Sequence, residues 1–151
     1  MTPPATSFSF VLETPAALPE EARRHFLAKL SVETDPADVH LDLERGKKGF
    51  VVVDVRTKEA HAERHVPGAL NLPSRTISAE TTAHLSRDDV IITYCWGPGC
   101  NGSTKAAARF AALGFRVKEM IGGIEYWVKE GHPTEGTAPR GTPVYTQRGD
   151  T

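Results

Sequence analysis

Residues 90–105 read VIITYCWGPGCNGSTK, an apolar run that gives way to a glycine-rich segment. The first part, 90–95, is β-branched and aromatic, which is typical of a strand buried on both faces of a parallel sheet. Glycines at 97, 99 and 102 then break the strand. The segment STKAAARFAALGF (103–115) is rich in Ala and predicts a helix that ends near Gly114. A strand, a loop and a helix therefore follow one another directly.

The same alternation continues on both sides of this stretch. Residues 50–56, FVVVDVR, have the pattern of a second buried strand. The sequence therefore predicts an α/β fold, a parallel sheet of about five strands with helices on both faces. Further strands are expected at 69–72 and 116–121, and further helices at 20–33, 36–45, 57–64, 78–86 and 124–131.

Composition divides the chain into three parts. Residues 1–34 are an N-terminal extension, Pro-, Ala- and Thr-rich at first and then helical. Residues 35–133 carry the strand and helix alternation and form the predicted globular domain. Residues 134–151 turn to Gly, Pro, Thr and Arg, which indicates a C-terminal tail whose order depends on docking.

Bulk properties argue against several classes of protein. The 151 residues are 39% hydrophobic and 25% charged, with a formal net charge of -1, so nothing favours nucleic acid or an anionic membrane as a partner. We find neither a membrane-spanning apolar run nor a secretory signal. Two cysteines fit a reducing compartment, and we expect a cytoplasmic protein. No oligomeric state is predicted.

Cys95 stands where a reactive group is expected. Ligands bind outside the carboxyl ends of the strands in open parallel sheets, and Cys95 ends such a strand. The glycines and the helix start near Ser103 should form an anion cradle that lowers the pKa of the thiol. A buried structural cysteine is the alternative interpretation.

The loop after Cys95 is the predicted substrate-binding segment. Lys105, one turn into the helix, could reach an anion bound there, although it could equally be a solvated charge. Cys100 is either a passive loop residue or a redox partner of Cys95. A metal site is not expected, because two cysteines need two more ligands and no histidine has ligand spacing. The loop residues are Trp96, Gly97, Pro98, Gly99, Cys100, Asn101, Gly102 and Ser103.

Three polar residues near the first strand are predicted to support the structure. Asp54 and Arg56 end that strand, where a buried pair would tie the strand end to the next segment. His65 precedes Val-Pro-Gly and is interpreted as a hydrogen-bonded packing residue, not a general base.

Taken together and in this order, these segments resemble the rhodanese family. That family shows a D-V-R strand end, then H-x-P-G-A-x-N-x-P, then Y-C before the active loop, then L-x-G-G with a Trp. The matching segments are VVVDVR (51–56), HVPGALNLP (65–73), IITYC (91–95), STKAAARFAALGF (103–115) and MIGGIEYW (120–127).

The resemblance implies a single rhodanese-like domain and a persulfide mechanism without a cofactor. Cys95 would take a sulfane sulfur from a small-molecule donor, thiosulfate or a persulfide. It would then pass that sulfur to a thiol or cyanide acceptor. Amides of the loop would hold the thiolate and the persulfide anion.

The loop departs from the family pattern, because the usual loop is shorter and often ends in Arg. None of residues 96–102 is charged, which predicts weak binding of the thiosulfate dianion. A phosphatase or arsenate reductase on the same fold is one alternative, but it would need an Arg for its anion. A non-catalytic rhodanese-like binding module is the other alternative.

Overall fold

The computed structural model describes residues 7–139 and 141–144, and the chain divides into two compact units, 1–31 and 32–151. The first unit holds most of helix α1, Pro19–Val32, with acidic residues in its first turn and Lys29 in its last. Those charges match the helix dipole. None of the residues of α1 is buried.

The second unit is built on a sheet of five parallel strands, and this confirms the predicted fold class. The strands are β1 (Glu33–Thr34), β2 (Phe50–Asp54), β3 (Leu70–Asn71), β4 (Val90–Tyr94) and β5 (Val117–Met120). Their spatial order is β1-β5-β4-β2-β3. Asp54 pairs with Tyr94, so β2 and β4 end at the same level of the sheet. Residues that follow these two strands therefore lie at one edge.

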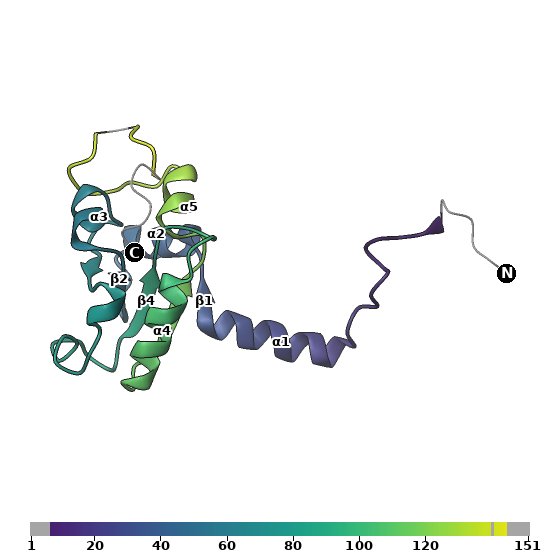
Figure 1. The fold of residues 1–151 in the computed structure, drawn as a ribbon. Coiled ribbons are helices and arrows are strands. Elements are labelled where there is room, and N and C mark those ends of the chain that lie inside the picture. Colours follow the sequence, from purple (N-terminus) through teal and green to yellow (C-terminus); the bar gives the residue numbers. More distant parts are fainter. Residues whose placement is uncertain (1–6, 140, 145–151) are drawn as a thin grey trace. The chain divides into compact units, whose positions relative to one another are not determined.

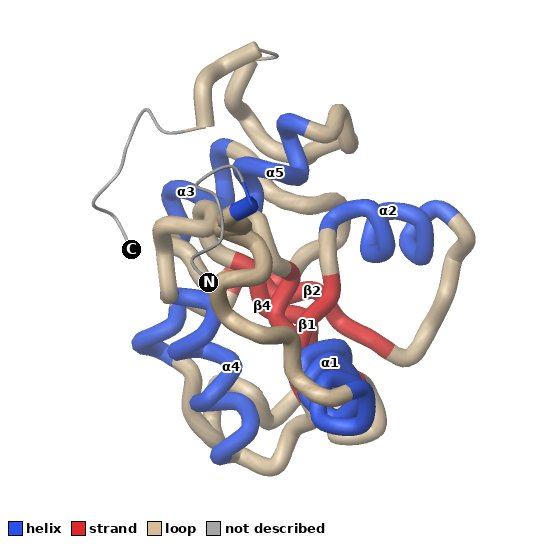
Figure 2. The backbone as a smooth tube through the Cα atoms, turned by 90° about the vertical axis from the view of Figure 1, so that its right-hand side faces the viewer, coloured by secondary structure: helices blue, strands red, loops and turns tan. Residues whose placement is uncertain are grey.

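Helices cover the two faces of this sheet, as Figures 1 and 2 show for α4 on one side of the strands and α2 on the other. In the described part of the chain, no helix is both long and apolar enough to span a bilayer. The helices of the second unit are α2 (Pro36–Glu44), α3 (Lys58–Glu63), the 3-10 helix η2 (Ser74–Thr76), α4 (Gly102–Ala112) and α5 (Gly123–Lys129).

The core lies between the sheet and these helices. Its large side chains are fully buried, among them Val53, Ile91, Tyr94, Phe110 and Trp127. Burial of both faces explains why β2 and β4 are continuous apolar runs instead of alternating ones.

The structure contradicts the predicted helix at 78–86, where the chain forms successive turns. Side chains there bond to the backbone in place of a helical ladder: the hydroxyl of Thr82 donates to the carbonyl of Ser78 at 2.7 Å, and that of Thr81 to the carbonyl of Thr76 at 2.7 Å. Ser and Thr compete with helix formation in this way. The two-residue strand β1 was not predicted, because so short a strand leaves no periodicity to detect.

The described part of the C-terminal segment docks beside α3. His65 and Glu135 exchange two backbone hydrogen bonds of 2.9 Å, and Ala138 donates to the carbonyl of Glu63 at 2.9 Å. The Arg64 guanidinium also donates to the carbonyl of Thr142 at 2.6 Å. The described residues of this segment therefore pack against the end of α3 and the residues that follow it.

Candidate active site

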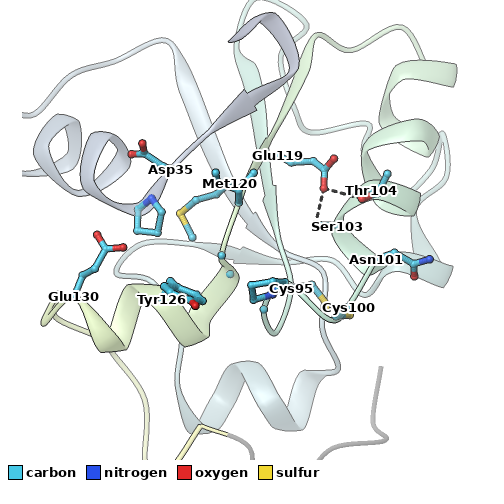
Figure 3. A pocket seen from close by; sticks show the side chains of 16 residues that line it. Asp35, Cys95, Cys100, Asn101, Ser103, Thr104, Glu119, Met120, Tyr126 and Glu130 are labelled. Carbon is cyan, nitrogen blue, oxygen red and sulfur yellow. Dashed lines mark hydrogen bonds between the residues drawn. The ribbon is translucent and has the colours of Figure 1, made fainter. Parts of the chain in front are cut away.

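A cavity of about 530 Å³ opens beside the carboxyl ends of β4 and β5. Figure 3 shows Cys95 and Cys100 next to each other, with labelled side chains of other elements around them, among them Asp35, Glu119 and Tyr126. Cys95 comes directly after β4, and Glu119 lies near the end of β5. Further lining side chains include Asp35, Pro36, Asn101, Ser103, Thr104, Met120, Tyr126 and Glu130.

The two thiols of the chain meet in this cavity. Their Sγ atoms are 2.8 Å apart, and neither cysteine is in a disulfide. Cys95 is 2% exposed, whereas Cys100 is half-buried. The amide of Gly102 donates to Sγ of Cys100 at 3.4 Å. A Cβ on Gly102 would lie 2.8 Å from Sγ of Cys95, so a side chain at this position would displace the sulfurs.

A β-turn brings Cys100 back to Cys95. The amide of Cys100 donates to the carbonyl of Gly97 at 3.0 Å, so 97–100 form the turn. Pro98 is at the second position, where proline is favoured because its φ is already set. The Gly-Pro-Gly-Cys order therefore determines that the chain folds back over the first thiol.

Electrostatics at Cys95 contradict the expectation of a lowered pKa. Burial raises the pKa of the Cys95 thiol, contact with the Cys100 thiol raises it further, and the backbone amide of Trp96 opposes them only in part. The expectation of a lowered pKa rested on the glycine amides and the start of α4. The sequence does not show that the sulfur itself is buried. The raised pKa favours the thiol form of Cys95 over the thiolate in this arrangement.

The turn between β5 and α5 contacts the start of the loop that follows Cys95. Ile124 and Glu125 donate their amides to the carbonyls of Cys95 and Trp96, at 3.0 and 2.9 Å. Gly123 has φ +61°, and a Cβ there would lie 2.6 Å from the carbonyl oxygen of Cys95. The sequence analysis includes Gly123 only in the matching segment 120–127. The structure adds its close contact with the active loop.

All ionisable lining residues other than the two thiols and Tyr126 are acidic. Among the described residues around the cavity there is no Lys, Arg or His, but Asp35, Glu119 and Glu130 all line it. The hydroxyls of Ser103 and Thr104 donate to Oε2 of Glu119 at 3.0 and 2.8 Å (Figure 3). The carboxylate of Glu119 therefore already accepts the hydroxyl hydrogen bonds of the first turn of α4. Sequence reasoning missed Glu119, since an isolated acid in a strand carries no motif.

The predicted loop residues separate into two groups. Gly97, Pro98, Cys100, Asn101 and Ser103 line the cavity, whereas Trp96, Gly99 and Gly102 do not. Lys105 is exposed on α4 and does not line the cavity either, so the structure does not place it as an anion contact.

Trp96 corrects the prediction of a substrate-binding side chain. It is 4% exposed, and the guanidinium of Arg56 stacks over its ring at 4.5 Å from the centroid. The indole points toward the β2 strand end because an aromatic face there stabilises the buried cation.

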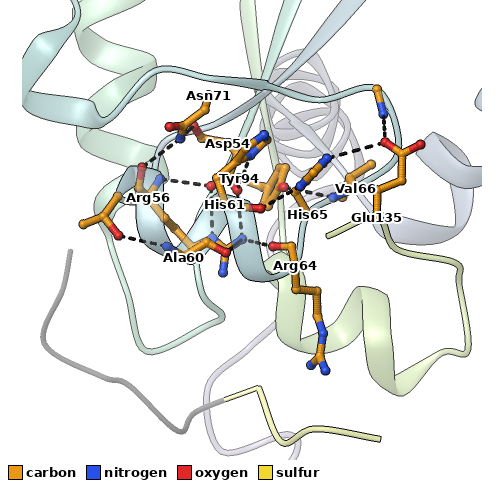
Figure 4. Close-up of polar contacts among 12 residues, drawn as sticks. Asp54, Arg56, Ala60, His61, Arg64, His65, Val66, Asn71, Tyr94 and Glu135 are labelled. Atoms are coloured by element: carbon orange, nitrogen blue, oxygen red, sulfur yellow. Dashed lines mark hydrogen bonds and ion pairs between the residues drawn. The ribbon is translucent and has the colours of Figure 1, made fainter. Parts of the chain in front are cut away.

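Arg56 and Asp54 form a buried ion pair at the end of β2 (Figure 4). The guanidinium donates to Oδ1 and Oδ2 of Asp54 at 3.0 and 2.8 Å, and Arg56 also donates its amide to Oδ1 at 3.0 Å. Burial alone would raise the pKa of Asp54, but hydrogen bonds from His61 and Arg56 outweigh it and lower the pKa. Burial likewise opposes the charge on Arg56, and Asp54 outweighs it, so its pKa is raised.

Neighbouring side chains complete this cluster. His61 Nδ1 lies 3.0 Å from Oδ2 of Asp54, and the ring of His61 stacks on that of His65 at 3.8 Å between centroids. His65 Nδ1 lies 2.6 Å from the carbonyl of His61. The side-chain amide of Asn71 donates to the backbone carbonyls of Asp54 and Arg56 at 3.1 and 3.0 Å. Asp54 and Arg56 therefore bond to each other, His65 contacts His61 and Glu135, and none of the three lines the cavity. Within 7–139 and 141–144, no three His, Cys, Asp or Glu side chains gather to hold a metal ion.

Comparison with known proteins adds to this geometry. A family model described as the Rhodanese-like domain matches residues 35–130. Thiosulfate sulfurtransferase 16, chloroplastic, from Arabidopsis thaliana is 32% identical over 99 residues, which is 58% of this chain and 81% of the plant protein. The HTH-type transcriptional regulator Rv0324 from Mycobacterium tuberculosis is 35% identical over 100 residues, 66% of this chain.

The chain spans less than half of that regulator, 44% of its length. Among solved structures, the crystal structure of BH2092 protein from Bacillus halodurans superposes with a TM-score of 0.84 at 54% identity. That superposition covers 87% of this chain and 96% of the other chain.

Proposed function

Because the chain belongs to the rhodanese-like family, we propose that it is a sulfurtransferase in which Cys95 carries a sulfane sulfur as a persulfide. The observation that carries the proposal is the position of this thiol: it follows a central parallel strand directly and lines a cavity beside the first turn of α4. Related sulfurtransferases support it by their names. The activity is assigned to residues 35–133, with 1–34 and 134–151 as flanking segments.

Sulfur enters in one displacement. The Cys95 thiolate attacks the outer sulfur of the donor, the sulfur–sulfur bond of the donor breaks, and sulfite or a thiolate leaves. Cys100 lies 2.8 Å from the attacking atom, so a donor has to align on a side of the Cys95 sulfur that Cys100 does not cover.

Sulfur leaves in a second displacement. An acceptor thiolate or cyanide attacks the outer sulfur of the persulfide, and the Cys95 thiolate is the leaving group. Dividing the transfer in this way lets one sulfur atom serve donor and acceptor in turn. The chemistry needs Cys95 reduced at the start of each cycle, and this favours a cytoplasmic location.

Charge in the cavity favours a persulfide donor over thiosulfate. Thiosulfate is a dianion, and the charged side chains that line the cavity are carboxylates. Like charges at close range cost about 1 kcal/mol in water and more when partly buried. A low-molecular-weight persulfide has less negative charge next to its reactive sulfur.

The same observation disfavours a phosphatase or arsenate reductase. Those reactions need a cationic grip on an oxyanion, usually from Arg. Arg56 is occupied by Asp54 and stacks on Trp96, and Lys105 does not line the cavity. A purely binding role would leave the paired thiols without a use.

Intact mass measurement tests the proposal. Reduced protein is incubated with thiosulfate or glutathione persulfide and desalted. We expect wild type, sampled immediately after the donor is added, to gain the mass of one sulfur atom, with more loading from the persulfide. The matched Cys95→Ser protein should gain none. Equal loading of both proteins would refute Cys95 as the carrier. No added sulfur on wild type and no sulfide release, with either donor, would refute the activity.

A further inference from the structure

We propose that Cys100 is a second catalytic residue: it attacks the Cys95 persulfide, releases sulfide and leaves a Cys95–Cys100 disulfide. The inference rests on the proposed function, since it starts from the loaded Cys95. It adds an activity, the reductive release of a sulfane sulfur without an external acceptor.

Distance is the first argument. The Sγ atoms that would form the new bond are 2.8 Å apart. This is shorter than the separation of about 3–3.5 Å between the reacting atoms of well-aligned pairs. A disulfide bond measures about 2.0 Å, so this pair has to approach by less than an ångström. Two thiols held in this way react with a high effective concentration.

The backbone is the second argument, because it holds Cys100 in this position. The turn at 97–100 is closed by the Cys100 amide, and the Gly102 amide donates to Sγ of Cys100. Gly102 has no side chain, and any Cβ there would lie 2.8 Å from one sulfur and 3.4 Å from the other. The loop is therefore shaped to let the sulfurs meet.

Exposure and charge are the third argument. Cys95 is buried, while the half-buried Cys100 lies beside it on the lining of the cavity. An external thiol acceptor reacts as an anion and must pass Asp35, Glu119 and Glu130, which also line the cavity. Cys100 pays no such penalty because it is already inside.

The step balances in atoms and electrons. The Cys100 sulfur attacks Sγ of Cys95, the bond between Sγ and the outer sulfur breaks, and the Cys100 proton goes to the leaving sulfur as HS⁻. The Cys100 sulfur is oxidised as it joins the disulfide, the Cys95 sulfur keeps the oxidation level it had in the persulfide, and the sulfane sulfur is reduced to sulfide. A small dithiol or a protein dithiol must then reduce the disulfide before another cycle.

A single-turnover experiment without added thiol tests the step. Wild type, Cys100→Ser and Cys100→Ala are loaded with thiosulfate, desalted at once and followed by intact mass and sulfide assay. We expect wild type to lose the added sulfur, to end two hydrogen masses below the reduced protein and to release one sulfide per chain. Both variants should keep the persulfide at least ~10-fold longer.

Three results separate the outcomes. Sulfide release that is first order and independent of protein concentration supports attack within one chain, and dependence on concentration overturns it. A wild-type persulfide that persists as long as in both variants, with no disulfide in a non-reducing peptide map, also overturns the role of Cys100 and leaves the proposed sulfurtransferase intact. A longer lifetime in Cys100→Ser but not in Cys100→Ala would mean that residue 100 acts by its size or polarity, and would overturn it as well.

Discussion

The ends of β2 and β4 lie side by side in one sheet, with Asp54 opposite Tyr94, yet their polar groups are treated differently. At the end of β2, the Asp54 carboxylate and the Arg56 guanidinium are both buried and bonded to each other. At the end of β4, a buried thiol has another thiol as its neighbour and no cation among the described cavity residues. At the end of β2 the two charges neutralise each other in an ion pair, whereas at the end of β4 the thiols stay available for reaction.

The difference assigns stability to one strand end and chemistry to the other. A buried ion pair is costly to break, because removal of one partner leaves the other charge unpaired. A thiol is a small, weakly polar group whose burial costs little, so it can lie at a strand end without a charged partner. The predictions below test this division, from the largest expected effect to the smallest.

Single substitutions at the two strand ends should give opposite results. Cys95→Ser is expected to reduce sulfur loading to the level of a protein-free blank and to cost less than about 1–2 kcal/mol of stability. Asp54→Ala should cost about 3–5 kcal/mol, because Arg56 stays buried without its carboxylate. Urea unfolding and persulfide loading, measured on both variants, check this. A stable Asp54→Ala protein without activity would place Asp54 in the active site.

The raised pKa of Cys95 predicts a steep dependence of reactivity on pH. Only the thiolate reacts, and a thiol whose pKa lies above the working pH gains about tenfold thiolate per pH unit, hence about 100-fold from pH 7 to 9. Alkylation of Cys95 by iodoacetamide, followed by peptide mapping, measures it. Cys100→Ser should react faster at pH 7, because contact with Cys100 is one cause of the raised pKa. A rate already constant above pH 7 would restore the lowered pKa that the sequence predicted.

Gly123→Ala should disturb the loop through its backbone. The new Cβ would meet the carbonyl of Cys95 at 2.6 Å, and φ is +61°, so we expect a loss of about 1–3 kcal/mol and slower sulfur loading. Gly46→Ala is the matched control, since φ there is +65° and nothing lies within 4 Å of its Cβ. Equal effects of the two variants on loading would show that the contact with the loop does not matter.

The smallest effect is expected from the charge of Glu119. Glu119→Gln keeps the size of the side chain and an acceptor for Ser103 and Thr104, but removes one negative charge. The Michaelis constant for thiosulfate should fall a few-fold at low salt, since Glu119 is partly solvated and such a charge contributes about 0.2–1 kcal/mol. Glu59→Gln, an exposed change on α3, is the control for net charge. Identical constants in both variants would exclude Glu119 from donor selection.

Strong local patterns were read correctly from the sequence. Two strands are confirmed at the apolar runs 50–54 and 90–94, and a helix is confirmed in the Ala-rich segment after the loop. These elements could be predicted because their residue types indicate which positions are buried. The prediction of a helix at 78–86 was wrong, because Ser and Thr side chains there compete with the backbone for hydrogen bonds. Trp96 was misplaced because the sequence does not show that Arg56 lies beneath it.

By itself, the sequence determined the fold class and the position of Cys95 at a strand end. Both depend on neighbours along the chain: apolar runs and the glycines that end them. Only the tertiary structure decided that Cys95 is covered, that its pKa is raised, that Glu119 and Glu130 share its cavity and that Gly123 supports its loop. These properties depend on contacts between segments far apart in the chain, where burial and charge come from whichever residues the fold brings together.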